Sequence, residues 1–238
     1  MTVRPYIVLS CCISLDGYLD DAATDRLRLS NDLDFARVDA VRATCDAILV
    51  GANTIRNDDP RLLVQAPALR AARVAGGRRP SPLKVTVTRT GALDPRSRFF
   101  TAGDSDRLVY CSSSAVAEAR RRFGAAATVA DAGARPSMDR IVSDLACRGV
   151  TRLLVEGGGD VLTQFLTGGL ADELHLAVAP LFVGDHRGAR FVKDGRFPWT
   201  TGQRAELIDT RAVGDVALLR YALSDHCTDG PTAAVAFP

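Results

Sequence analysis

The feature that most constrains this chain is the stretch "LLVEGGGDVL" at residues 153–162, where an apolar strand runs through three glycines into a helix. Glycine loses more backbone entropy on folding than any other residue, so three in a row need a compensating role. Without Cβ atoms, backbone N–H groups at a helix start can approach a pyrophosphate closely, and the helix dipole favours the negative charge. The block therefore predicts a phosphate-bearing cofactor. The alternative is a plain tight connection, which ordinarily uses one glycine.

The order of expected elements indicates an α/β fold. Short apolar strands are expected at residues 6–13, 46–50, 83–88, 108–111 and 153–155, as buried parallel strands read. Helices are expected at residues 31–44 and 115–123, around 138–145, and after the glycines. Later, residues 174–178 alternate, and "ELIDTRAVGDVALLRY" reads as a hairpin around Gly214. The pattern predicts one mixed sheet, parallel at its centre with antiparallel C-terminal strands, and helices on both faces.

Composition excludes several classes of protein. The chain has 238 residues, 47% of them hydrophobic and 24% charged, with a net charge of +2. No long basic run suggests nucleic acid as a partner. The six cysteines form no C-x-x-C pair, which favours reduced buried thiols over a metal site. No window is apolar enough to span a membrane, and the N-terminal apolar run reads as a strand rather than a signal peptide.

We therefore expect a cytoplasmic protein without a metal. One domain is expected over residues 1–224, followed by a frayed tail over residues 225–238. Residues 66–82, rich in Ala, Arg, Pro and Gly, are expected to form a mobile loop.

The glycine block is not G-x-G-x-x-G and lies late in the chain, which disfavours an ordinary Rossmann dehydrogenase. A second strand-to-helix turn follows Gly51, where Thr54 either caps a short helix or bonds a phosphate oxygen. Asp58 and Asp59 precede Pro60 and read as turn-capping residues on their own. Arg42 lies on the helix face of Phe35 and Val38, which we expect to pack on the sheet, so its charge needs a partner or an anion.

Polar residues also follow two central strands. Thr88 and Arg89 close one strand and the serines 112–114 close the next. Hydroxyls and a guanidinium there suit the 2′-phosphate of NADP, although turns and helix caps explain them equally well. His175 alternates with apolar neighbours and reads as a core histidine rather than a catalyst. No Ser/His/Asp or Cys/His set is visible.

Three blocks together resemble one known family. The blocks are "PYIVLSCCISLDGYLD", "VRATCDAILVGANTIRNDDPRLLV" and "LLVEGGGDVLTQFLTGGLADELHLAVAPLFVG". Together they resemble the pyrimidine reductases of riboflavin biosynthesis, over roughly residues 5–222. The resemblance implies a dihydrofolate-reductase-like fold, NADPH as hydride donor and a homodimer. It also implies reduction of a ribosylamino group to a ribitylamino group on a phosphorylated pyrimidine. The cofactor would carry that chemistry while the protein supplies orientation and electrostatics.

The resemblance assigns residues to this reaction. Glu156 would bond the substrate near the reacting carbon, as the catalytic residue. Substrate contacts would come also from Arg42, the main chain near Leu62, and the position of Gln65. The turn at residues 14–17 would lie beside the nicotinamide. Cofactor contacts would come from Thr54, Asp58, Gly158, Gly159, Asp160, Val161 and Leu162. We also expect cofactor contacts at Cys12, and at Thr88 and Arg89, which are inferred from their position at a strand end rather than from the resemblance.

Two departures from the family pattern leave the substrate open. Gln65 stands where the family often has an arginine that helps to hold the substrate phosphate, and "DRLRLSND" matches poorly in its first half. The zinc-deaminase motifs H-x-E and P-C-x-x-C are absent, so deamination is not expected. The alternatives are a reductase of another heterocycle, such as a pterin or a secondary-metabolite intermediate, and a non-catalytic dinucleotide-binding relative.

Overall fold

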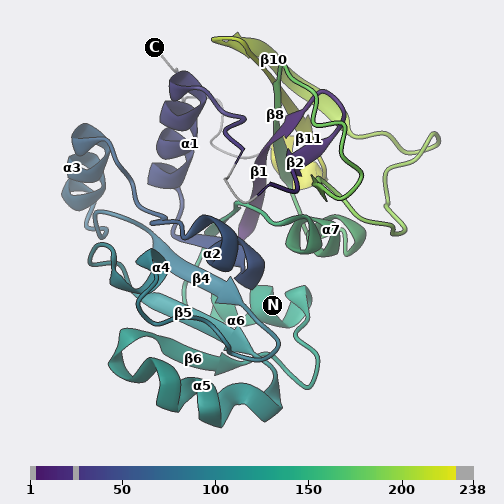
Figure 1. Cartoon of the computed structure of the whole chain (residues 1–238). Helices are drawn as coiled ribbons and strands as arrows, with labels where there is room; N and C mark the ends of the chain where they lie inside the picture. The colour runs from purple at the N-terminus through teal and green to yellow at the C-terminus, as the bar shows by residue number, and fades with distance from the viewer. Residues whose placement is uncertain (1–3, 24–26, 229–238) are drawn as a thin grey trace. The chain divides into compact units, whose positions relative to one another are not determined.

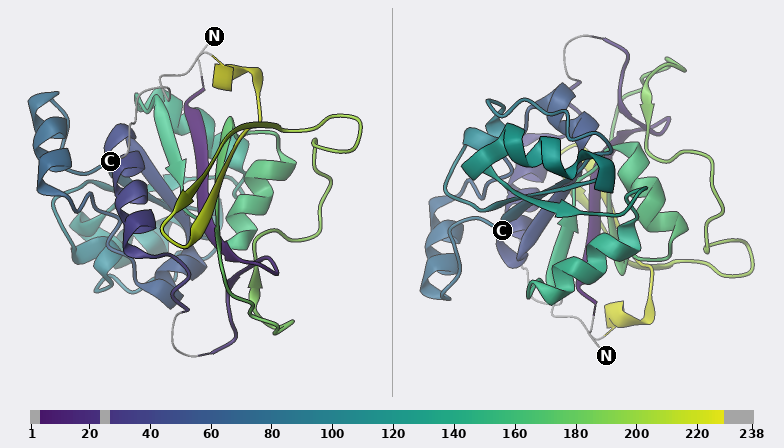
Figure 2. Two further views of the ribbon diagram at one scale, coloured as in Figure 1. Left: turned by 90° about the horizontal axis from the view of Figure 1, so that it is seen from above. Right: turned by 90° about the horizontal axis from the view of Figure 1, so that it is seen from below.

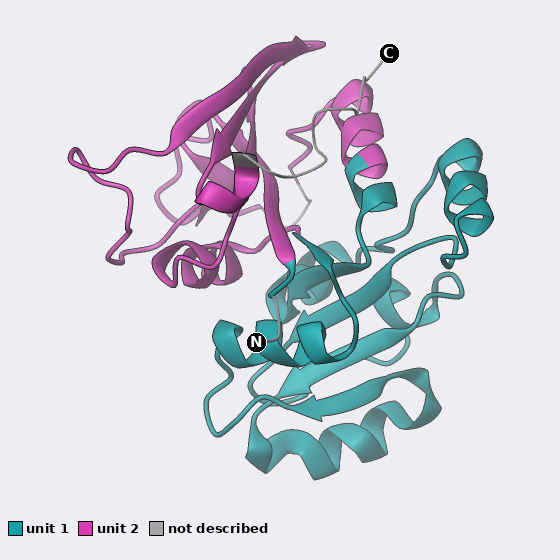
Figure 3. Ribbon diagram, turned by 180° about the vertical axis from the view of Figure 1, so that it is seen from behind, with its two compact units in different colours: residues 1–5, 41–154 teal, residues 6–40, 155–238 magenta. Residues whose placement is uncertain are grey.

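The computed structural model describes residues 4–23 and 27–228 (Figure 1). The chain divides into two compact units, each made of two stretches of sequence (Figure 3). Unit 1 comprises residues 1–5 and 41–154, and unit 2 comprises residues 6–40 and 155–238. The sequence therefore enters unit 2, crosses into unit 1 within a helix, and returns to unit 2 just before the glycine block. The last ten residues of the expected tail, 229–238, lie outside the described part of the chain.

Unit 2 contains four neighbouring strands in the order β10-β11-β8-β1. β1 (Tyr6–Ser14) pairs in parallel with β8 (Glu173–Ala179), and the two lie side by side in Figure 2. β11 (Val216–Ala222) is antiparallel to β8 and forms the expected hairpin with β10 (Glu206–Val213). A separate two-stranded ribbon joins β2 (Tyr18–Asp20) to β9 (Ala189–Arg190). The late antiparallel strands predicted from sequence are confirmed.

Unit 1 has the strand order β7-β3-β4-β5-β6. β3 (Ala47–Gly51), β4 (Leu83–Val87), β5 (Arg107–Cys111) and β6 (Thr128–Asp131) pair in parallel, and β7 (Arg152–Val155) lies next to β3. β3 is buried along its whole length, as a run of "AILVG" without polar residues requires. The mixed α/β fold predicted from the sequence is thereby confirmed, although the short strand β6 was not anticipated.

Most helices come directly after a strand along the chain. Unit 1 contains α2 (Ala52–Asp58), α3 (Pro67–Ala75), α4 (Arg98–Thr101), α5 (Val116–Phe123) and α6 (Met138–Cys147). Unit 2 contains α7 (Gly159–Thr167), whose apolar face is buried as expected, and α1 (Asp32–Thr44) begins in unit 2 and ends in unit 1. Short 3-10 turns occupy Ser113–Ala115, Gly124–Ala126 and Asp225–Thr228, so the expected tail begins with an ordered turn.

The expected packing face of α1 is wrong. Phe35 is 46% exposed, and the side chains buried toward unit 2 are Asp34 and Arg37. Arg28 lies over the Phe35 ring, with its guanidinium carbon 5.3 Å from the ring centroid. The error arose because hydrophobic periodicity assumes that apolar residues face inward. Here the buried side chains Asp34 and Arg37 are charged: they pair with each other, and Arg37 also contacts the neutral ring of His175 on β8.

The expectation of a mobile loop at residues 66–82 is also wrong. Pro67 begins α3 and Gly76 is its C-cap, the order in which proline and glycine flank helices. The one buried side chain of α3 is Arg73, so no apolar stripe marks the helix in the sequence. Arg73 donates from Nη1 to the carbonyls of Ala43 and Cys45 at 2.8 and 2.7 Å, at the end of α1.

Candidate active site

The glycine block of unit 2 has the backbone that only glycine adopts readily. Gly157 and Gly158 have φ angles of 108° and 73°, in the left-handed half of φ space. Gly158 is the N-cap of α7, and its carbonyl accepts from the N–H groups of Val161 and Leu162 at 2.9 and 3.1 Å. The earlier N–H groups of a helix have no intrahelical acceptor and point outward. A Cβ at Gly157 would meet nothing within 4 Å, so open space adjoins this turn.

The third glycine, Gly159, is required for a different reason: a side chain there would collide with neighbouring backbone. A Cβ on Gly159 would lie 2.4 Å from the carbonyl oxygen of Arg190, which is backbone and cannot move aside cheaply. The segment after β9 is held onto α7 because the N–H of Lys193 donates to Thr163 Oγ1 at 2.9 Å. Lys193 Nζ also pairs with Asp160 Oδ1 at 2.5 Å. This ammonium offsets a carboxylate in the first helical turn, where it would otherwise repel a phosphate.

Glu156 stands between β7 and the first of these glycines. Its backbone lies at the junction where the strand ends, and its side chain is half-buried. The positive φ of Gly157 turns the chain sharply right after it. The predicted catalytic carboxylate is therefore placed beside the N-terminus of α7, in the unit that carries the glycine block.

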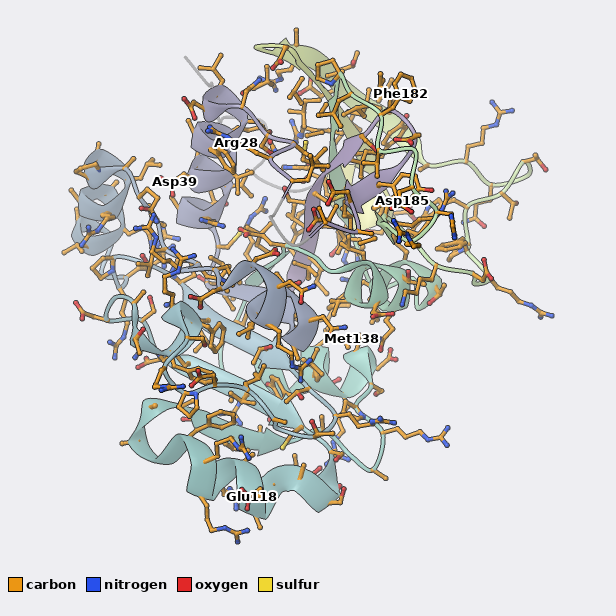
Figure 4. The ribbon with its side chains drawn as sticks, in the orientation of Figure 1. Arg28, Asp39, Glu118, Met138, Phe182 and Asp185 are labelled. Carbon is orange, nitrogen blue, oxygen red and sulfur yellow. The ribbon has the colours of Figure 1, made fainter. Side chains whose placement is uncertain are left out.

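The turn at residues 14–17 is also in unit 2 and is tightly bonded. Ser14 Oγ donates to Asp16 Oδ1 at 2.5 Å and accepts from the N–H of Tyr18 at 3.0 Å. Asp16 accepts from the N–H groups of Val183 and Gly184 at 3.1 and 2.8 Å. The hydrogen bond from Ser14 and these amides lower the pKa of Asp16 to about 2. The turn is thus fixed to the loop that follows β8, where Phe182 and Asp185 are labelled in Figure 4.

Cys12 lies on β1 just before this turn. Its thiol is half-buried, and burial raises its pKa, so the neutral thiol is the form present near pH 7. It packs against a small apolar cluster formed by Ala177, Ala179 and Val216. These contacts make Cys12 a packing residue of unit 2, and its contact with a cofactor stays a prediction. All six cysteines are unpaired thiols, but only Cys45 and Cys111 are buried; the expectation of burial is wrong for Cys147, which is exposed at the end of α6.

Unit 2 contains a buried network of charged and polar side chains that was not predicted from the sequence. Arg37 Nε pairs with Asp34 Oδ1 at 2.7 Å, and its Nη1 lies 3.4 Å from His175 Nδ1. Because arginine only donates, Nδ1 of His175 accepts and Nε2–H donates to Glu173 Oε1, 2.8 Å away. Arg220 Nε donates to the same oxygen at 2.9 Å. Only the i, i+3 spacing of Asp34 and Arg37 hinted at this network.

The network explains two pKa shifts. Burial lowers the pKa of His175, and the nearby guanidiniums add to the effect, so the ring is neutral. Burial alone would raise the pKa of Glu173, but the hydrogen bond from His175 and the hydrogen bonds and charge of Arg220 outweigh it and lower the pKa to about 2. His175 is therefore a core histidine with a structural role, as the sequence indicated.

In unit 1, α2 carries two predicted cofactor residues. Its N-cap is Gly51, with no side-chain cap, so the expectation that Thr54 caps this helix is wrong. Thr54 is a half-buried residue of the first turn, and Asp58 is the last residue of α2. Asp59 follows in the left-handed region with φ of 41° and ends the helix. Its carboxylate accepts from the backbone N–H and Nε of Arg98 at 2.6 and 3.1 Å.

The predicted substrate residues of unit 1 lie together. Arg42 Nη1 donates to the carbonyl of Leu63 at 3.1 Å, and Gln65 Nε2 donates to the same oxygen at 3.3 Å. Leu62 is buried and has a φ of 48°, an unusual angle for a residue with a branched side chain. Arg42 thus holds the segment around Leu62, and the Gln65 side chain lies exposed beside it.

Residues after β4 and β5 also meet. Thr88 Oγ1 accepts from the N–H of Gly91 at 3.2 Å and so serves the turn. The carbonyl of Arg89 accepts from Ser112 Oγ at 2.6 Å, and Ser112 Oγ lies 3.1 Å from Ser114 Oγ. No hydrogen bond or ion pair engages the Arg89 guanidinium within residues 4–23 and 27–228. A guanidinium and two hydroxyls at neighbouring strand ends suit an anion.

The described part of the chain contains neither a metal-binding cluster nor a membrane-spanning helix. No group of three or more His, Cys, Asp or Glu side chains there is arranged to hold a metal ion. No helix in the described ranges is long and apolar enough to cross a membrane.

The family model named RibD C-terminal domain matches residues 5–219. A 2,5-diamino-6-ribosylamino-4(3H)-pyrimidinone 5′-phosphate reductase of Archaeoglobus fulgidus is 36% identical and covers 81% of this chain and 88% of its own length. The protein of the same name from Methanothermobacter thermautotrophicus is 33% identical and covers 93% of this chain and 99% of its own length.

Solved structures agree on the fold. A pyrimidine reductase-like protein of Corynebacterium diphtheriae superposes with a TM-score of 0.78 at 22% identity, over 93% of both chains. A bifunctional deaminase/reductase of Thermotoga maritima gives a TM-score of 0.74 at 22% identity, over 92% of this chain and 56% of its own.

The fold and the glycine-bearing site define a dihydrofolate-reductase-like α/β protein of the kind found in these reductases. The chain belongs to the RibD C-terminal domain family. The family resemblance and the fold class stated from the sequence are thereby confirmed.

Proposed function

We propose that this protein is an NADPH-dependent reductase of riboflavin biosynthesis that converts the ribosylamino group of a pyrimidine phosphate to a ribitylamino group. The observation that carries the proposal is the turn from Glu156 through Gly157 and Gly158 into α7. Its left-handed glycines and open space fit a pyrophosphate at a helix start. The Archaeoglobus and Methanothermobacter relatives, 36% and 33% identical, are both named as reductases of such a compound.

The same relatives refine the substrate. Both are named for a 2,5-diamino-pyrimidinone, a compound that has not been deaminated. We therefore place the 2,5-diamino compound ahead of the deaminated uracil that the sequence resemblance alone would favour.

The residues of the chain would bind and orient. The glycine block and residues 160–162 would hold the cofactor's phosphates, and Thr54 and Asp58 of α2 would contact the cofactor as well. When bound, NADPH supplies the hydride for the ring-opened imine form of the substrate. Glu156 would hydrogen-bond the substrate near the reacting carbon, and Arg42 with the segment around Leu62 would hold its ribose phosphate. Positioning of this kind provides much of the rate enhancement when a cofactor does the chemistry.

The test is NADPH oxidation with the 2,5-diamino substrate and, separately, with its deaminated counterpart. We expect turnover of the first to exceed turnover of the second. The Glu156→Gln variant should lose roughly 100-fold or more in kcat if the carboxylate acts at the reacting carbon. Rapid turnover of neither substrate by folded protein would remove the assignment and leave a non-catalytic dinucleotide-binding relative.

A second candidate substrate class is favoured by one observation. Gln65 cannot supply the positive charge that the family often places there, and its amide bonds the carbonyl of Leu63 instead. If another heterocycle without a phosphate is the substrate, dephosphorylated analogues should react as well as the phosphorylated compound. We expect a large preference for the phosphate ester, because Arg42 lies beside this segment.

We attribute the preference for NADPH over NADH to Arg89, Ser112 and Ser114. We propose that these groups bind the 2′-phosphate, so NADPH should bind at least about 10-fold more tightly than NADH. The Arg89→Met variant should reduce that preference and leave NADH binding unchanged. Equal affinities for both cofactors in the unsubstituted protein would refute this role.

We also propose a cytoplasmic homodimer. β10 is an edge strand of unit 2, where Leu207 and Ile208 are 50% and 38% exposed at a break in its register with β11. An exposed apolar edge favours pairing with another chain. Analytical ultracentrifugation should show a dimer, and Leu207→Asp should shift the protein toward monomer.

A further inference from the structure

We propose that Lys84, together with Arg107, is a positioning residue for the cofactor site, acting through α4 on the C-terminal end of α2. The proposal rests on the proposed function only in taking Thr54 and Asp58 of α2 as cofactor contacts. The physical chain of contacts lies entirely within unit 1.

Lys84 is fully buried on β4, at 0% exposure. Its ammonium donates to the carbonyl of Phe99 at 3.1 Å and to the carbonyl of Ala102 at 2.6 Å. Arg107 is its register partner on β5, and Nη2 of Arg107 donates to the carbonyls of Ala102 and Gly103 at 3.4 and 2.5 Å. Two cations from neighbouring strands therefore meet the carbonyls at the C-terminal end of α4, where the backbone is electronegative.

α4 is short but firmly packed. Phe99 and Phe100 are buried, their rings meet edge to face with centroids 4.9 Å apart, and Phe100 stacks on Phe123 at 4.8 Å. A four-residue helix has little stability of its own. Its position therefore depends on these rings and on the two cations that bond its last carbonyls.

The other end of α4 bonds the end of α2. The backbone N–H and Nε of Arg98, the first residue of α4, donate to the carboxylate of Asp59, and its Nη2 lies 3.5 Å from the carbonyl of Asp58. Asp59 holds a left-handed φ of 41°, which costs energy for a residue with a Cβ and needs surrounding support. The contact with Arg98 supplies that support directly after Asp58.

The charges around Lys84 set its response to pH. Burial lowers the pKa of Lys84 to about 8, and the charge of Arg107 adds to the effect. Nearby at the start of β5, Asp106 is paired with Arg79 at 3.2 Å, and Arg79 also donates to the carbonyl of Asp104. Above pH 8 the amine becomes neutral and its hydrogen bonds to α4 weaken, because charge-assisted bonds are the stronger ones.

The first experiment needs no cofactor. Hydrogen exchange of the amides in α2 is measured in the full chain for the unsubstituted protein, Lys84→Met and Arg98→Gln. Both variants should speed exchange of α2 about 10-fold, the effect of losing one charge-assisted hydrogen bond. The matched control is Arg148→Met, which removes a cation from the end of α6, where it pairs with Asp144 at 2.6 Å. The control should leave α2 unchanged.

The second experiment measures NADPH. Lys84→Met should raise KM for NADPH about 10-fold and change kcat less than about 2-fold, because the variant disturbs positioning rather than chemistry. In the unsubstituted protein the dissociation constant for NADPH should rise between pH 7.5 and 9. Lys84→Arg stays charged across that range, so it should restore tight binding and lose the rise.

The outcomes are separable. Unchanged exchange of α2 in both Lys84→Met and Arg98→Gln overturns the positioning role whether or not the protein binds NADPH. Absence of NADPH binding by the unsubstituted protein overturns the proposed function and leaves the exchange result to decide the positioning role. If Lys84→Met does not fold, Arg98→Gln alone decides, because Arg98 is exposed and its replacement leaves the core intact.

Discussion

The two units bury charge in opposite ways. In unit 1, the buried cations Lys84 and Arg73 bond only backbone carbonyls, at the ends of α4 and α1. In unit 2, the buried guanidinium of Arg37 and the buried carboxylate of Glu173 belong to one network that runs through neutral His175. Carbonyl dipoles do not titrate, whereas carboxylates do.

The difference predicts where each unit is sensitive. A cation held by carbonyls loses strength only when the cation itself is deprotonated. A network of ionised partners fails when either sign is neutralised, because the remaining buried charge is left uncompensated. The network of unit 2 should therefore weaken at acid pH, whereas the contacts of Lys84 in unit 1 should weaken at alkaline pH.

The largest effect is expected for Glu173→Gln in unit 2. The change removes the carboxylate that both His175 and Arg220 contact and leaves Arg220 only the longer contact with Asp209, at 3.6 Å. Breaking a buried pair in this way costs about 3 to 5 kcal/mol. Urea unfolding at pH 7 measures it, and a loss below about 1 kcal/mol would show that the network contributes little.

Glu173 also predicts that the free energy of unfolding falls at acid pH. The folded pKa of Glu173, about 2, lies below its ordinary value of 4.5. Its stabilisation is fully present above pH 4.5 and is lost as the pH falls toward 2, by on the order of 3 kcal/mol. Glu173→Gln should reduce this dependence of the free energy of unfolding on acid pH. An unchanged slope of unfolding free energy between pH 5 and 3 would contradict the assignment.

A smaller loss is expected for Arg73→Met in unit 1. The variant removes the donor to the carbonyls of Ala43 and Cys45 but leaves no charge unpaired. Hydrogen bonds from a charged group contribute about 1.5 to 3 kcal/mol. The loss should be the same at pH 4 and pH 7, and a loss that grows toward either pH would break the distinction between the units.

Gly159→Ala tests unit 2 without changing charge. The new methyl group would lie 2.4 Å from the carbonyl oxygen of Arg190, so the segment after β9 must shift. Overpacking of this kind costs about 1 to 3 kcal/mol, independent of pH. NADPH binding should weaken with it. Gly202→Ala, whose new methyl group would meet only Thr200 Oγ1 at 4.0 Å, is the steric control that should leave NADPH binding unchanged.

The smallest effect is expected for Arg28→Met. This exposed arginine pairs with Asp32 and lies over the Phe35 ring, but the partners stay in water. Surface ion pairs and exposed cation–π contacts contribute about 0.5 to 1 kcal/mol. A loss of more than 2 kcal/mol in thermal unfolding would show that this surface of α1 is buried in an assembly.

Sequence patterns predicted the elements whose buried side chains are apolar. β3 and the buried face of α7 were anticipated because uninterrupted or periodic apolar residues mark them. α3 and the inward face of α1 were missed because Arg73, Asp34 and Arg37 occupy the buried positions. Periodicity cannot identify a buried charge whose partner lies far away in the sequence.

For the candidate site, too, local patterns predicted some features, and features that depend on distant contacts were missed. The glycine turn before a helix followed from a local motif, whereas the resemblance named Arg42 and the main chain near Leu62 as substrate contacts without predicting the hydrogen bond from Arg42 to Leu63. The requirement for Gly159 depends on Arg190, thirty-one positions later. Thr54 does not cap α2, one of the two roles considered for it, because Gly51 is the N-cap. Such facts depend on tertiary contacts that no short motif records.

The chain has two lysines, Lys84 and Lys193, and the first is fully buried. An amine-reactive dye used on the native protein at neutral pH should therefore couple at Lys193 and at the chain's α-amino group. The Lys193 side chain is 62% exposed and contacts Asp160 in the first turn of α7. With its amino terminus blocked, the native protein becomes a single-site fluorescent reporter whose signal arises beside the glycine block.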